Sequence, residues 1–107
     1  QYRGNDGGDG ADSFGAGDVR DVLHLAPLAR SLGGLDVANA YLLGYSRGGM
    51  VAMLALARGL DVRAAAAVGG LYDVAALANE RPELRARLAH AGEDVEAALR
   101  ERSAVAW

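Results

Sequence analysis

Residues 40–58 read Ala-Tyr-Leu-Leu-Gly-Tyr-Ser-Arg-Gly-Gly-Met-Val-Ala-Met-Leu-Ala-Leu-Ala-Arg, and this stretch decides which fold the chain can adopt. Its first four residues are apolar and bounded by Gly44, a pattern that predicts a short buried strand. Residues 49–58 are apolar almost all round, which predicts a buried helix that ends at Gly59. The stretch is therefore expected to run from a strand through a sharp turn into a helix.

Helix and loop patterns precede this stretch. Residues 4–17 are rich in Gly and Asp and predict a loop. Asp18 is expected to be the N-cap of a helix that ends near Gly33. Pro27 lies inside that helical pattern and is expected to kink the helix or to split it in two. Residues 36–39 predict a second loop.

Strand and helix patterns also follow it. Residues 62–68 predict a second buried strand, although the four alanines within it also favour a helix. From Asp73 onward the pattern is helical, in pieces broken at Pro82 and Gly92. The order of loop, helix, strand, helix, strand and helices predicts an α/β fold with parallel strands and helices packed on the sheet faces.

Composition excludes several classes of protein. The chain has 107 residues with 51% hydrophobic and 23% charged side chains, which is ordinary for a globular protein. It has no Cys, which excludes disulfides, thiolate zinc sites and a Cys nucleophile. A net charge of -3 gives no basic footprint, so no nucleic-acid partner is expected. No apolar run approaches the roughly 18 residues of a membrane span, so no membrane partner is expected either.

Residues 44–49, Gly-Tyr-Ser-Arg-Gly-Gly, match Gly-x-Ser-x-Gly, the nucleophile elbow of serine hydrolases. The turn from strand to helix exposes the Ser hydroxyl and strains the Ser backbone, so Ser46 is the predicted catalytic nucleophile. Gly44 and Gly48 are expected because side chains there would collide where strand and helix pass closely. The backbone N–H of Arg47 is the predicted oxyanion-hole donor, aided by the helix dipole. The Arg47 side chain could serve substrate or structure.

A nucleophilic Ser needs a base and an orienting acid, and in this class of enzyme the chain order is Ser, acid, His. His24 precedes Ser46, and His90 lies in the helical tail only two short elements after it. We expect neither to be the base. Asp73 could be the acid, but we expect its carboxylate to cap the helix that begins there. The sequence therefore completes no triad.

The Gly-rich loop invites a metal-binding interpretation. Asp6, Asp9 and Asp12 are three residues apart, whereas the ligands of an EF-hand loop are two apart, and no Glu closes the site. We therefore expect a solvated turn, with no metal. The chain also has no Lys, which excludes a phosphate-binding P-loop, and no cofactor is expected.

An ordered set of landmarks resembles the α/β-hydrolase catalytic domain of the prolyl oligopeptidase family. The elbow looks like that of the bacterial dipeptidyl aminopeptidase and acylaminoacyl-peptidase-like members. The landmarks are residues 2–5 (Tyr-Arg-Gly-Asn), the Gly-rich loop through Phe14 and Gly15, residues 18–22, the elbow at 44–50, residues 68–70 with Asp73, and residues 102–105.

The resemblance implies a serine peptidase that cleaves short peptides through an acyl-enzyme at Ser46. It implies that residues 1–107 are a central fragment of one catalytic domain. The acid and the His would then follow Trp107, and a second oxyanion donor would precede Tyr2. Many dipeptidyl-peptidase relatives carry Tyr where this chain has Arg47, which argues against the same dipeptide specificity.

Two alternatives stay open at this stage. One is a carboxylesterase or dienelactone-hydrolase-like enzyme that acts on small esters, and the other is a non-catalytic α/β binding module. The expected partner is a peptide or a small ester substrate. The sequence leaves the compartment open between the cytoplasm and a periplasmic or secreted location, because a targeting segment would precede a chain that begins inside a motif.

Overall fold

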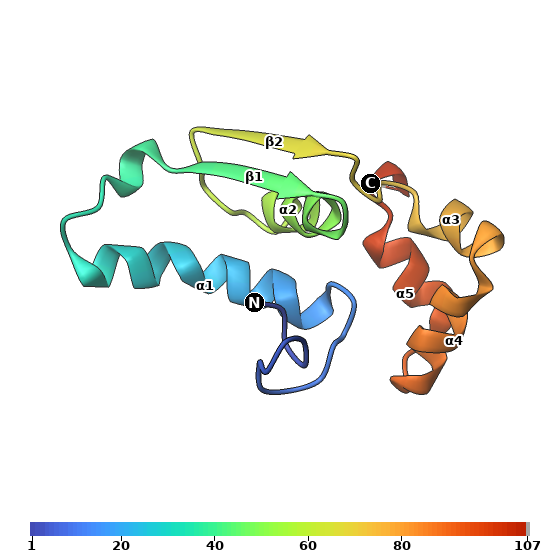
Figure 1. Ribbon diagram of the computed structural model, residues 1–107. Coiled ribbons are helices and arrows are strands. Elements are labelled where there is room, and N and C mark those ends of the chain that lie inside the picture. The colour runs from blue at the N-terminus through green and yellow to red at the C-terminus, as the bar shows by residue number, and fades with distance from the viewer. Residues whose placement is uncertain (107) are drawn as a thin grey trace.

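The computed structural model describes residues 1–106 and has the alternating order that the sequence predicts (Figure 1). Trp107 lies outside the described residues. Short 3-10 turns η1 and η2 accompany the main helices and strands. The elements are α1 (Ala16–Leu32), η1 (Val37–Asn39), β1 (Tyr41–Tyr45), α2 (Arg47–Ala57), β2 (Ala64–Val68), α3 (Val74–Glu80), α4 (Pro82–His90), α5 (Val95–Arg102) and η2 (Ala104–Ala106).

The two strands pair in parallel, and α2 connects them as a crossover helix. Their register runs from Tyr41 opposite Ala64 to Tyr45 opposite Val68. Helix α1 packs beside α2, below the sheet in Figure 1. Helices α3, α4 and α5 form a separate group beyond the carboxyl ends of the strands. The described chain is thus one strand–helix–strand unit with a helix on one side and a helical group at one end.

The hydrophobic core surrounds α2, as the apolar composition of that helix predicts. Met50 and Ala55 are almost completely buried, and so are residues from α1, α3, α4 and α5. Gly59 follows the helix with φ of 86°, a left-handed conformation that favours glycine after a helix end. The core residues are Phe14, Val19, Met50, Val51, Leu54, Ala55, Val74, Ala78, Leu88, Ala98 and Leu99.

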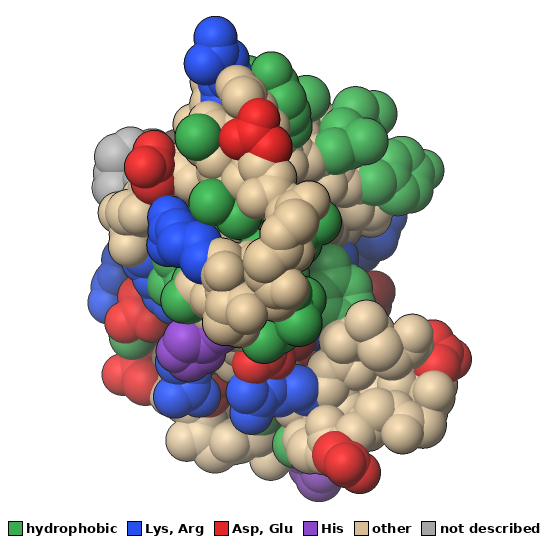
Figure 2. All heavy atoms as spheres, turned by 90° about the vertical axis from the view of Figure 1, so that its left-hand side faces the viewer, with side chains coloured by type: hydrophobic (Ala, Val, Ile, Leu, Met, Phe, Trp, Pro, Cys, Tyr) green, Lys and Arg blue, Asp and Glu red, His purple; other side chains and the backbone are tan. Residues whose placement is uncertain are grey.

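The strands are far more exposed than the sequence predicts. Tyr41, Leu43 and Tyr45 are 67%, 75% and 75% exposed, and β2 is exposed along most of its length. The prediction of two buried strands is therefore wrong for these residues, because α2 packs on one face of the sheet and no described element covers the other. Figure 2 shows apolar side chains gathered on the upper part of the molecule, where Figure 1 places the sheet.

Helix α1 differs from the sequence prediction in two ways. Gly15, not Asp18, is the N-cap, and the Asp18 carboxylate accepts a 3.0 Å hydrogen bond from the Gly15 N–H. An acidic side chain in the first helical turn is stabilising for the same electrostatic reason as a cap. Pro27 does not split the helix, which is continuous. Pro27 is exposed, so water can replace the backbone hydrogen bond that its ring removes.

The later helices begin and end as the sequence predicts. The Asp73 carboxylate accepts a 2.8 Å hydrogen bond from the Ala76 N–H and so caps α3. Pro82 is the first residue of α4, where its missing N–H costs no hydrogen bond. Gly92 follows α4 with φ of 75°. Among the described residues, no helix has both the length and the apolar character needed to cross a membrane.

Candidate active site

Ser46 lies at the junction of β1 and α2 in a strained backbone conformation. Its φ is 51° and its ψ is -118°, values that non-glycine residues rarely adopt and that cluster at functional sites. Two backbone hydrogen bonds of 2.9 Å hold the turn: the Ser46 N–H donates to the Val68 carbonyl, and the Ser46 carbonyl accepts from the Gly49 N–H. The Ser46 residue itself is exposed. A strained, hydrogen-bonded turn therefore places an exposed serine at the carboxyl end of β1.

Three glycines line this turn, and a side chain at each would meet a different neighbour. A Cβ on Gly44 would lie 2.7 Å from the carbonyl carbon of Gly48, which is too close for any side chain. A Cβ on Gly48 would meet only the Tyr2 hydroxyl, at 3.3 Å, so Gly48 makes room for Tyr2 and not for the strand. The sequence reasoning missed Gly49, where a Cβ would lie 2.7 Å from Cα of Gly70. The pairs Gly48-Gly49 and Gly69-Gly70 were the visible signal of this close approach.

The Arg47 side chain binds the Gly-rich loop, which answers the question that the sequence leaves open. Its Nη1 and Nη2 donate to both carboxylate oxygens of Asp12, at 2.9 Å and 2.6 Å. Nη2 also lies 2.5 Å from the buried Asp18 carboxylate. The guanidinium carbon stacks 4.3 Å from the centre of the Tyr2 ring and 5.2 Å from that of Phe14. The side chain is thus occupied by structural contacts.

The charges in this cluster perturb its ionisable groups. The hydrogen bond from Arg47 holds the pKa of Asp12 well below its usual range. Arg87 of α4 lies 3.7 Å from Asp12 and adds a second positive charge. Burial raises the pKa of the Tyr2 hydroxyl. The interpretation of Asp12 as part of a solvated turn is therefore wrong, because a cation 35 residues away in the sequence folds onto it.

Arg102 of α5 holds the same loop from its other side, a role that the sequence does not suggest. It is 3% exposed and donates to the backbone carbonyls of Phe14, at 2.9 Å, and Ser13, at 3.0 Å. It also pairs with Glu93 at 2.8 Å. An Arg in the last turn of a polar helix usually faces solvent, so no local pattern distinguishes it.

The other predicted site residues do not come together with Ser46. His24 is exposed on α1 and His90 is exposed at the end of α4, while the Asp73 carboxylate caps α3. Within residues 1–106, no hydrogen bond joins the Ser46 hydroxyl to any of these three side chains, and no acidic and His cluster suited to a metal ion is present. The described residues therefore place none of these three side chains in hydrogen-bond contact with the predicted nucleophile Ser46.

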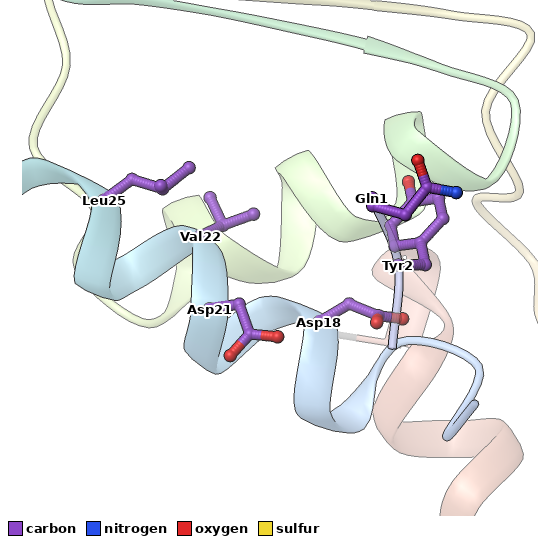
Figure 3. Close-up of a pocket in the computed structure, with 6 residues that line it drawn as sticks. All are labelled: Gln1, Tyr2, Asp18, Asp21, Val22 and Leu25. Carbon is purple, nitrogen blue, oxygen red and sulfur yellow. The ribbon is translucent and has the colours of Figure 1, made fainter. Parts of the chain in front are cut away.

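A cavity of about 460 Å³ lies beside the elbow, between the N-terminal segment and α1 (Figure 3). Tyr2 connects the cavity to the elbow, because its ring lines the cavity while its hydroxyl lies next to Gly48. Ser46 is not one of the lining residues. These are Gln1, Tyr2, Asp18, Asp21, Val22 and Leu25.

Comparison with known proteins finds a similarity to an uncharacterised peptidase, YtmA, of Bacillus subtilis (strain 168). The two sequences are 32% identical over 85 residues, which is 78% of this chain and 33% of that protein. The chain therefore spans about a third of the length of this relative. No protein-family model matches the chain, and no solved structure matches it. The similarity links the chain to a protein named as a peptidase, without specifying the prolyl oligopeptidase type.

Proposed function

We propose that this chain is the nucleophile-bearing part of a serine-type peptidase of the prolyl oligopeptidase type, built on an α/β-hydrolase fold. The observation that carries the proposal is the strained and exposed Ser46 between a parallel strand and a buried helix. The similarity to a protein named as a peptidase supports the choice of a peptidase among serine hydrolases. The proposed substrates are short peptides.

The proposed reaction proceeds through an acyl-enzyme. The Ser46 oxygen attacks the scissile carbonyl carbon while its proton passes to a general base. The C–N bond then breaks, the amine leaves with that proton, and water hydrolyses the resulting ester. Arg47 is the first residue of α2, so its N–H has no carbonyl of the preceding helical turn to bind. That N–H and the positive end of the helix would stabilise the oxyanion.

We place the general base and the orienting acid in segments of the longer protein outside residues 1–107. The chain order of this class of enzyme, Ser then acid then His, puts both after Ser46. The positions of His24, His90 and Asp73 support this assignment, since none of them bonds to Ser46 within the described chain. The relative, of which this chain spans 33%, is long enough to hold such segments.

A fluorophosphonate probe on the full-length protein tests the nucleophile. Ser46→Ala should abolish covalent labelling, because the probe reacts with an activated Ser hydroxyl. Ser31→Ala is the matched control: Ser31 is exposed on α1 and its hydroxyl donates to the Leu28 carbonyl within the same helix, so its loss should leave labelling intact. Undiminished labelling of the Ser46→Ala protein would show that the proposal is wrong.

Substrate turnover separates a peptidase from the esterase alternative, which would use the same elbow. A peptidase should turn over an aminoacyl-nitroanilide at a readily measured rate, although a nitrophenyl ester of the same acyl group, which has the better leaving group, should react faster. An esterase would hydrolyse only the ester at a useful rate, because the anilide needs the protonation of its leaving group that peptidases provide. A protein that does neither, and is not labelled, would be a binding module.

A further inference from the structure

The side chain that follows the nucleophile also fixes the loop that lies beside it. Arg47 makes two hydrogen bonds to Asp12, one ion pair to Asp18 and a stacking contact with Tyr2. These partners lie at the beginning, the middle and the end of residues 2–18. The same residue therefore carries the backbone N–H proposed for the oxyanion hole and the guanidinium that anchors the loop.

The guanidinium is mostly buried and is held by the loop. Its side chain is 16% exposed, and both terminal nitrogens are used by Asp12 and Asp18. The remaining Nε atom is buried and has no hydrogen-bond partner among the described residues. A direct role in binding a substrate carboxylate would require Arg47 to leave two carboxylates in a mostly buried site.

We propose that Arg47 is a positioning residue that couples the Gly-rich loop to the nucleophile elbow. This inference rests on the proposed function. Contacts of its guanidinium set the orientation of the first turn of α2, and hence the direction of the Arg47 N–H beside Ser46. They also seat the Tyr2 ring, whose hydroxyl occupies the space that Gly48 leaves free. The loop and the elbow thus form one rigid wall of the active site.

The geometry calls for Arg and not merely for a positive charge. A planar guanidinium can bind a carboxylate with two parallel hydrogen bonds and stack on an aromatic ring at the same time. A Lys ammonium could reach one carboxylate but could neither bind Asp12 through two nitrogens nor stack flat on Tyr2. Arg47→Lys should therefore show the same slow labelling of Ser46 as Arg47→Met, although it keeps the positive charge.

The experiment compares two arginines that anchor the same loop in the full-length protein. Arg47→Met should slow fluorophosphonate labelling of Ser46 by about 10- to 100-fold, because small misplacements of catalytic groups cost rates of that order. With peptide substrate, kcat should fall and KM should change little. Arg3→Met is the matched control, since Arg3 ties the loop to the α1 residue Asp21 through an exposed ion pair, and it should label within about twofold of the wild-type rate.

Hydrogen exchange supplies a readout that does not depend on activity. Arg47→Met should increase amide exchange in residues 44–49 as well as in residues 2–18, whereas Arg3→Met should affect only the loop. Should Arg47→Met fail to fold, Asp12→Asn removes the two-point contact with little change in volume and should give the same pattern.

The outcomes distinguish this inference from the proposed function. If the wild-type protein is labelled and folded Arg47→Met is labelled equally fast, the positioning role is wrong and the nucleophile assignment stands. If the wild-type protein is not labelled at all, the proposed function fails. Amide hydrogen exchange then tests by itself whether Arg47 couples the Gly-rich loop to the elbow. Unchanged exchange at residues 44–49 in Arg47→Met would then overturn the coupling as well.

Discussion

Ser13 and Phe14 have a defined conformation because two arginines hold their loop from opposite sides. Arg47 binds the neighbouring Asp12, and Arg102 binds the carbonyls of Ser13 and Phe14. Phe14 has φ of 46°, an unfavourable value for an aromatic residue that persists only when surrounding contacts impose it. A segment with many glycines is thus held by long-range charge contacts in addition to its own local hydrogen bonds.

Removal of the Arg102 side chain should destabilise the protein strongly. Arg102→Met leaves the Ser13 and Phe14 carbonyls and the Glu93 carboxylate without their donor, and the loss of one partner from a buried charged network costs about 3–5 kcal/mol. Urea unfolding of the full-length protein measures the change. Arg100→Met, two residues away on the exposed side of α5, should stay within about 0.5 kcal/mol of wild type. Equal effects of the two substitutions would contradict the role of Arg102 in holding the loop.

The Asp12–Arg47 pair should make stability depend on pH in the acidic range. The pKa of Asp12 is lower in the folded protein than its value of about 3.9 in an unfolded chain. Its stabilising contribution is therefore complete above about pH 5 and declines as the pH falls below the unfolded value.

The comparison of wild type with Asp12→Asn tests this dependence. The difference in unfolding free energy between them should be constant above about pH 5 and should shrink between about pH 5 and pH 2. Asp9→Asn, an exposed carboxylate in the same loop, should change the unfolding free energy little. A difference between wild type and Asp12→Asn that grows on acidification would have the wrong sign for this pair.

At the scale of elements, sequence reasoning succeeded where the signal is local and failed where it depends on distant residues. The succession of β1, Ser46 and α2 follows from an apolar run, a Gly-flanked turn and an apolar helix. Strand burial could not follow from the same run, because it depends on what covers the other face of the sheet. The Asp12–Arg47 pair spans 35 residues and leaves no periodic signal. Helix α1 begins before the predicted N-cap Asp18, because Gly15 adopts a left-handed conformation and is the N-cap instead.

The junction of β1 and α2 makes the two motif glycines unequal. Gly44→Ala places a Cβ against the backbone of α2, which cannot move without displacing Ser46, and should cost about 1–3 kcal/mol or more of stability. Gly48→Ala meets only the Tyr2 hydroxyl and should cost less. Thermal unfolding of the full-length variants measures both. A larger loss of stability for Gly48→Ala than for Gly44→Ala would contradict the close approach of α2 to β1 at Gly44.

At the scale of the whole molecule, the core is one-sided. Helix α2 packs on one face of the parallel sheet, while the face that carries Tyr41, Leu43 and Tyr45 is open. Parallel sheets in α/β proteins are covered on both faces, and an open sheet with two unpaired edges invites association. We therefore propose that further segments of an α/β-hydrolase domain cover this face in the full-length protein.

The substitution Leu43→Lys should have opposite consequences in the isolated chain and in the full-length protein. In isolated residues 1–107, Leu43 is 75% exposed, so a Lys there should reduce self-association, measured by sedimentation, without a large change in folding. In the full-length protein the same Lys would be buried under the proposed covering segments and should destabilise by about 3 kcal/mol or more. Ala57→Lys, exposed at the end of α2, is the control for added charge and should do neither. The isolated wild-type chain should also show no esterase activity, because it lacks the proposed base. If Leu43→Lys is harmless in both forms, the sheet face is not covered and the proposed domain is wrong.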